Sequence, residues 1–69
     1  MRLDVPYCIL YCNWNYGNDR PELTTIHLHG YCISEDDALL AAEHLYSDIG
    51  KPLVQIFHEG KLLREMAAH

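Results

Sequence analysis

The chain has 69 residues, of which 49% are hydrophobic, and ten acidic against five basic residues give it a net charge of -5 at pH 7. A chain this short forms one small domain, residues 1–69, without room for a deep substrate pocket. Its hydrophobic content excludes intrinsic disorder, and its negative charge disfavours direct binding to the phosphates of DNA or RNA.

The first half of the chain predicts two β-strands separated by a long loop. Residues 3–14 are rich in Tyr, Ile, Val and Cys, which favour strands, although Pro6 moves the regular part toward Tyr7. Residues 13–21 carry Asn, Gly, Asp and Pro, a composition typical of turns. Residues 23–33 then alternate as a half-buried strand does. The alternation predicts one face with Ile26, Leu28 and Cys32 and another with Thr25, His27, His29 and Tyr31.

Residues 34–49 predict a single amphipathic helix. Ser34 is a favourable N-cap with Asp37 three residues later, and the acidic first turn suits the positive end of the helix dipole. Gly50 is a natural stop. At about 100° per residue, the apolar stripe is predicted to centre on Ala38, Ala42, Leu45 and Ile49.

The last part of the chain predicts a hairpin. Residues 53–58 and 61–66 have strand composition, and Glu59 and Gly60 form a two-residue turn between them. The order strand, strand, helix, strand, strand predicts an α+β fold, with a single helix packed on one face of an antiparallel sheet of about four strands. The other face is then uncovered. Residues expected there are His27, His29, Tyr31, Gln55 and Phe57.

The cysteines favour a reducing compartment. Cys8, Cys12 and Cys32 are an odd number, and no apolar segment follows the first residues, so we expect a cytoplasmic protein without disulfides. No stretch approaches the ~18 apolar residues of a membrane span, so no membrane partner is expected. The cysteines of the first strand lie among apolar residues, which favours buried thiols over a reactive thiolate.

Neither a metal site nor an enzyme is expected. His27 and His29 could share a metal ion with Cys12 or His58, but the spacing lacks the close pairs, such as CxxC, of structural zinc sites. The adjacent carboxylates of the helix diverge by about 100°, which does not suit an acid and base acting on one substrate. We therefore expect no cofactor and no catalytic residues.

The polar side of the helix is the remaining candidate site. Its simpler interpretation is a solvated surface that serves capping and solubility. The alternative is a partner-binding surface, in which carboxylates meet Lys and Arg of a protein with a basic surface while one leucine supplies an apolar anchor. Such a surface would compete with nucleic acid. The candidate residues are Glu35, Asp36, Asp37, Leu40, Glu43 and Asp48.

A short acidic chain with a two-strand start, a helix opened by Ser34-Glu35-Asp36-Asp37 and a closing hairpin resembles the small phage-encoded anti-CRISPR proteins. The resemblance is one of architecture and composition over most of the chain, and no site residue is taken from it. It implies a stoichiometric inhibitor that binds a CRISPR effector subunit in the cytoplasm of the host bacterium.

The uncovered face of the sheet supports a different hypothesis. Aromatic and apolar residues on such a face favour a small regulatory or dimerisation module rather than an inhibitor. Under this alternative we expect a stable dimer whose contact includes Tyr31 or Phe57, whereas the inhibitor hypothesis expects a monomer or a weak homodimer.

Overall fold

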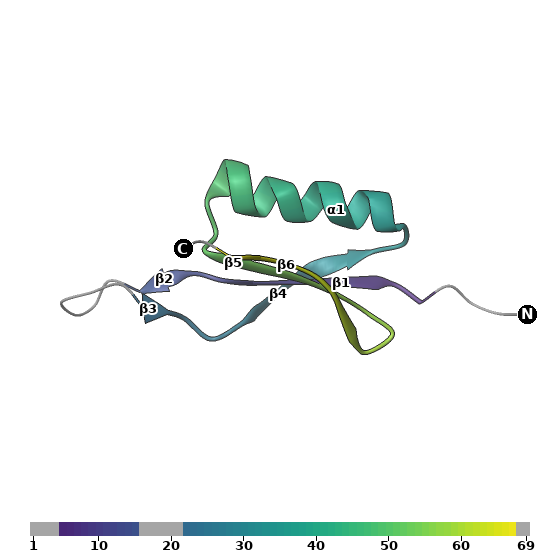
Figure 1. Cartoon of the computed structure of the whole chain (residues 1–69), viewed down its shortest axis with the longest axis horizontal. Helices are drawn as coiled ribbons and strands as arrows, with labels where there is room; N and C mark the ends of the chain where they lie inside the picture. The colour runs from purple at the N-terminus through teal and green to yellow at the C-terminus, as the bar shows by residue number, and fades with distance from the viewer. Residues whose placement is uncertain (1–4, 16–21, 68–69) are drawn as a thin grey trace, which may run out of the picture.

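The computed structural model describes residues 5–15 and 22–67, in which one helix lies across one face of a four-stranded antiparallel sheet (Figure 1). The sheet has the order β4-β1-β5-β6. Its strands are β1 (Tyr7–Cys12), β4 (His27–Cys32), β5 (Leu53–His58) and β6 (Lys61–Ala67), and a separate two-stranded sheet pairs β2 (Trp14–Asn15) with β3 (Glu22–Leu23). The predicted α+β class is confirmed.

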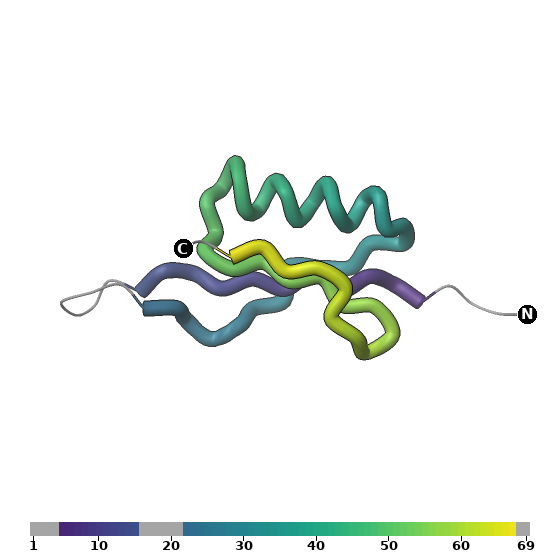
Figure 2. Tube along the Cα trace, viewed as in Figure 1, coloured from purple at the N-terminus to yellow at the C-terminus, as the bar shows by residue number. Residues whose placement is uncertain are grey.

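The strands β2 and β3 form a short antiparallel ribbon, with Trp14 opposite Leu23. At its base, the Asn13 carbonyl accepts a hydrogen bond from the Thr24 N–H, and the Asn13 N–H donates to Thr24 Oγ1, both at 2.9 Å. The prediction of a loop over residues 13–21 is therefore wrong at Trp14 and Asn15, which form β2. Residues 16–21 lie outside the described residues. Figure 2 shows this ribbon leaving the main sheet at the end opposite to the turn between β5 and β6.

A β-bulge interrupts the pairing of β1 with β4. Ile9 lies opposite Gly30 but Leu10 lies opposite Leu28, so His29 is an extra residue in β4. A bulge of this kind shifts the residues on its two sides by one position relative to a strict alternation. The alternation predicted across residues 23–33 is consequently wrong beyond the bulge.

Leu28 and Cys32 illustrate the correction, because they were predicted on one face and lie on opposite faces. Cys32 pairs with Tyr7 and packs against the core beneath the helix. Leu28 pairs with Leu10, on the face that points away from the helix. Tyr31, predicted opposite to Leu28, shares that outer face with it.

The helix begins where the sequence predicts. The segment α1 (Glu35–Glu43) continues directly into a π-helical turn, η1 (His44–Ile49). The backbone N–H of Asp37 donates a hydrogen bond to Ser34 Oγ at 3.2 Å, so Ser34 is the N-cap. This bond satisfies one of the backbone donors that a helix leaves free at its start.

The helix also ends as predicted, but its last turn is wider. Gly50 adopts a left-handed conformation with φ 85°, which ends the helix. The i to i+5 pattern of η1 changes the angular spacing of the last residues. Ile49, predicted within the apolar stripe, is therefore displaced from it and is 52% exposed.

The closing hairpin matches the prediction closely. Glu59 and Gly60 both have positive φ, 54° and 76°, as the tight turn between two antiparallel strands requires. The hydroxyl of Tyr46 donates to the carbonyl of Ala67 at 3.0 Å, which joins the helix to the end of β6. The two last elements of the chain are thus fixed to each other and to the helix.

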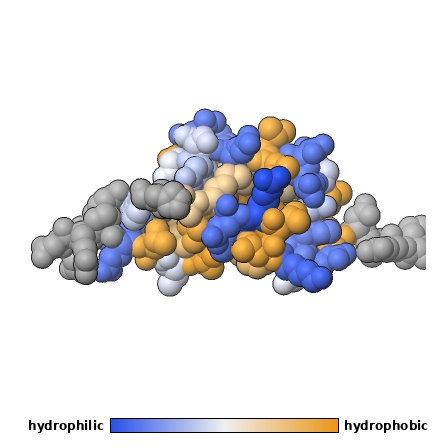
Figure 3. All heavy atoms as spheres, viewed as in Figure 1, coloured by the Kyte–Doolittle hydropathy of each residue, from blue (hydrophilic) through white to orange (hydrophobic). Residues whose placement is uncertain are grey.

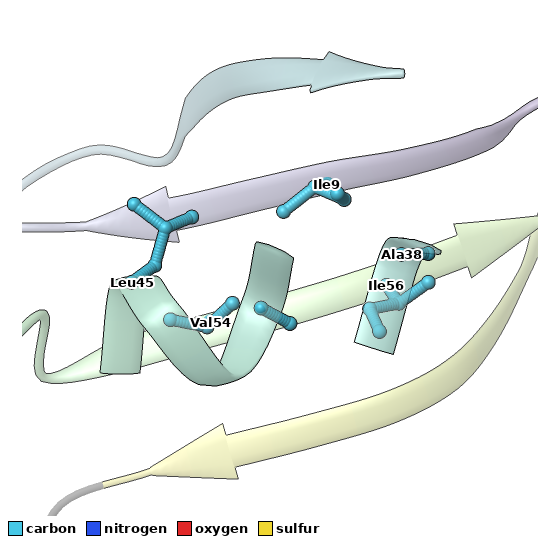
Figure 4. Packing of buried hydrophobic residues seen from close by; sticks show 6 residues of the cluster. Ile9, Ala38, Leu45, Val54 and Ile56 are labelled. Atoms are coloured by element: carbon cyan, nitrogen blue, oxygen red, sulfur yellow. The ribbon is translucent and has the colours of Figure 1, made fainter. Parts of the chain in front are cut away.

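The core lies between the helix and the sheet (Figure 4). Leu45 and Ala38 of the helix point toward Ile9, Val54 and Ile56 of the two central strands. Ala42 is also fully buried in this cluster. Because two helix residues of the core are alanines, the helix packs close to the sheet and the core is small. Within the described residues, no helix is long and apolar enough to cross a membrane.

Candidate functional site

The acidic helix surface, defined as Glu35, Asp36, Asp37, Leu40, Glu43 and Asp48, is exposed at every one of these positions. Asp36, Leu40 and Glu43 are four and three residues apart, so they share the side of the helix that faces away from the sheet. Leu40 is 66% exposed although it is apolar. Figure 3 shows hydrophobic atoms standing among the hydrophilic side chains of the helix.

A shallow hollow of about 350 Å³ lies at the centre of this surface. It is lined by Asp36, Leu39, Leu40 and Glu43, so two leucines are flanked by two carboxylates. A lysine or arginine of a partner fits this arrangement, because its aliphatic stem can lie on leucine while its cation meets a carboxylate. The helix carries no Lys or Arg that would compete for these carboxylates.

The remaining acidic residues are placed differently. Glu35 and Asp37 lie in the first turn, where their charges also favour the helix dipole. Asp48 belongs to η1, and its carboxylate lies 2.8 Å from Nδ1 of His44. The structure therefore brings together Asp36, Leu40 and Glu43 but leaves Asp48 as part of a separate surface pair.

The three cysteines are free, and they differ in burial. Cys12 is buried, as predicted, whereas Cys8 and Cys32 are half-buried. Cys32 packs on the helix side of the sheet. Cys8 pairs with Tyr31 and Phe57 on the face away from the helix.

The histidines contact tyrosines. The ring centroid of Tyr11 lies 5.5 Å from that of His27 and 6.3 Å from that of His29. Because Tyr11 packs against the core beneath the helix, the expectation that these histidines lie on the uncovered face is wrong, and the bulge is the reason.

His58 lies elsewhere in the sheet. It stacks on Tyr7 at 4.0 Å and donates a hydrogen bond to the Val5 carbonyl at 3.1 Å. Among the residues that the structure describes, no group of three His, Cys, Asp or Glu side chains is placed to hold a metal ion.

A second candidate is the open face, the side of the sheet that points away from the helix. Pairing registers arrange its residues in rows across the strands. The first row is Tyr31, Cys8, Phe57 and Leu62; the second is Leu28, Leu10, Gln55 and Glu65; the third is Cys12, Leu53 and Ala67.

Large apolar side chains of the open face reach the solvent. Tyr31 is 63% exposed, Leu28 51% and Leu62 49%. The polar pair in the middle row is internally bonded, because Gln55 Nε2 donates to Glu65 Oε2 at 2.6 Å. On the side seen in Figure 3, apolar side chains also reach the surface at the level of the sheet.

The sequence predicted only part of the open face. Tyr31, Gln55 and Phe57 were expected there, and they are found there. Leu28 was missed because the bulge hides its position from a simple alternation. Leu62 was not singled out, although its place beside Phe57 follows from the hairpin turn.

A comparison of the chain with protein-family models, with curated proteins and with solved structures found no match. The two surfaces are therefore interpreted from their own chemistry.

Proposed function

We propose that this protein is a non-enzymatic inhibitor that binds another protein through the acidic helix surface. The observation that carries the proposal is the hollow between Asp36 and Glu43, where the exposed Leu40 and the half-buried Leu39 are flanked by carboxylates. Leu40, the apolar residue at the centre of these charges, is 66% exposed. An apolar anchor surrounded by charges is the usual composition of a protein contact.

The charge of this surface defines the partner. With five acidic residues and no Lys or Arg, the helix complements a basic surface, and such surfaces occur where proteins hold nucleic-acid phosphates. Occupation of that surface would exclude nucleic acid by steric and electrostatic competition. The resemblance to anti-CRISPR proteins supports a subunit of a CRISPR effector complex as the partner.

The test is a binding measurement with purified multisubunit CRISPR effector complexes, using immobilised protein at low and high salt. We expect a complex that weakens as salt rises, because exposed charge pairs are screened over about 8 Å at physiological ionic strength. Loss of both central carboxylates in Asp36→Asn/Glu43→Gln should weaken binding roughly a hundredfold, if each lost charge contact contributes about 1.4 kcal/mol.

A matched control separates local contact from net charge. Glu22→Gln/Glu59→Gln removes the same charge from β3 and from the hairpin turn, both outside the acidic helix surface. This control should bind like the unchanged protein. Binding that persists in high salt and tolerates the helix substitutions would contradict the proposal, as would equal losses in both double variants.

A further inference from the structure

We infer that two copies of this chain associate through their open faces. The inference goes beyond the proposed function and does not rest on it, because the open face and the acidic helix surface lie on opposite sides of the sheet (Figure 1). In such a dimer the two sheets pack face to face, and each helix remains on an outer side.

The charge distribution of the open face favours an apolar binding partner. Among the described residues of the open face, Glu65 alone is charged, and it is already bonded to Gln55. Within the part of the chain that the structure describes, this face offers no Lys or Arg for nucleic acid and no set of carboxylates for a basic protein. A second copy presents the same uncharged apolar surface, whereas any contact through the helices would bring acidic residues together.

The area of the face suits a weak dimer. Four strands of about six residues span a flat footprint of roughly 20 by 19 Å, or about 400 Å² on each copy. The accessible surface of protruding side chains exceeds their flat footprint. Two such footprints total about 800 Å², which is below the roughly 1,200 Å² of stable interfaces and corresponds to weak, reversible association. The footprint alone is comparable to the largest apolar patch of a typical monomer, which is about 300–600 Å².

The size of the core supports the same conclusion. Beneath the helix, the buried cluster consists of Ile9, Ala38, Ala42, Leu45, Val54 and Ile56. Chains of this length commonly need a further source of stability, and oligomerisation is one of them. Face-to-face packing at about 10 Å would give each sheet a second apolar layer.

The polar pair of the open face is compatible with this contact. Glu65 lies on β6, an edge strand of the sheet. A carboxylate at this position stays at the rim of a face-to-face dimer and remains hydrated. Gln55 keeps its partner within the same chain, so the contact buries no unpaired polar side chain from this row.

The test is the molar mass of the full chain, measured by sedimentation equilibrium over a range of protein concentrations. We expect reversible association to twice the 8.0 kDa of the chain, with no weakening at high salt. Leu28→Glu should raise the dissociation constant roughly tenfold or more, because each copy then brings a hydrated carboxylate in place of a leucine to the edge of the contact.

The control is Leu40→Glu, which places the same charge at an exposed leucine on the helix, away from the open face, and should leave the dimer intact. Circular dichroism checks that each variant folds, and Tyr31→Glu replaces Leu28→Glu if the latter is unfolded. A chain that stays at 8.0 kDa at every concentration overturns the inference. So does a dimer that Leu40→Glu dissociates while the open-face variants do not.

Discussion

The two faces of the sheet both carry apolar residues but differ in what covers them. On the helix side, Ile9, Val54 and Ile56 have at most 1% of their surface exposed. On the open face, Leu28 and Tyr31 keep more than half of theirs. The difference shows that one amphipathic helix can complete only half of a sheet whose strands are apolar on both sides. In the dimer inferred above, a second copy covers the other half.

The largest expected difference between the faces concerns stability. Ile56→Ala, beneath the helix, should lower the free energy of unfolding by about 2–5 kcal/mol, because it removes buried methyl groups and leaves a cavity. Leu62→Ala, on the open face, should cost about 1 kcal/mol or less in the monomer, because half of that side chain is exposed. Urea unfolding, followed by circular dichroism in dilute solution, measures both. Equal losses would show that the open face is already covered within one chain.

The N-cap tests how firmly the helix holds the covered face. Ser34→Ala removes the acceptor for the Asp37 N–H and should lower stability by about 1 kcal/mol. Ser34→Asp should restore most of this loss, since aspartate caps equally well. Ser47→Ala, on the exposed side of the helix, serves as the control and should change stability by no more than about 0.5 kcal/mol. A loss in the control as large as that in Ser34→Ala would exclude capping as the cause.

The surface pair in η1 is expected to matter least. His44 and Asp48 are 61% and 70% exposed, so water screens their interaction. Asp48→Asn should therefore change the free energy of unfolding by about 0.5 kcal/mol or less. It should weaken partner binding less than the loss of Asp36 or Glu43 does, because Asp48 belongs to the acidic helix surface but lies outside the hollow at Asp36 and Glu43. A thermal melt and the immobilised binding measurement check these two expectations.

Much of the fold could be predicted from local signals. Ser34 and Gly50 mark the two ends of the helix, and Glu59-Gly60 marks the hairpin, because each residue type suits the backbone geometry required there. What the sequence did not show depends on the pairing between strands. The extra residue His29 is recognised only when β4 is paired with β1. The ribbon likewise depends on the pairing of β2 with β3, two segments that are separated in the sequence.

The candidate sites were likewise predicted only in part from the sequence. Helical spacing alone predicts that Asp36, Leu40 and Glu43 lie together, and the structure places them around one hollow. The same spacing did not predict the π-helical turn η1, in which the changed helical pitch leaves Ile49 exposed. No local pattern places Leu28 on the open face, because its position depends on a bulge in the pairing.

Two native cysteines allow the most direct test of the contrast between the faces. Cys8 and Cys32 are both free and half-buried, but Cys8 lies on the open face and Cys32 on the helix side. We would measure the rate of thiol labelling at each cysteine, by mass spectrometry of peptides, as the protein concentration rises. If two copies associate through their open faces, labelling of Cys8 slows with concentration while that of Cys32 does not change. Concentration-independent labelling of both cysteines, or slowing confined to Cys32, would contradict this account.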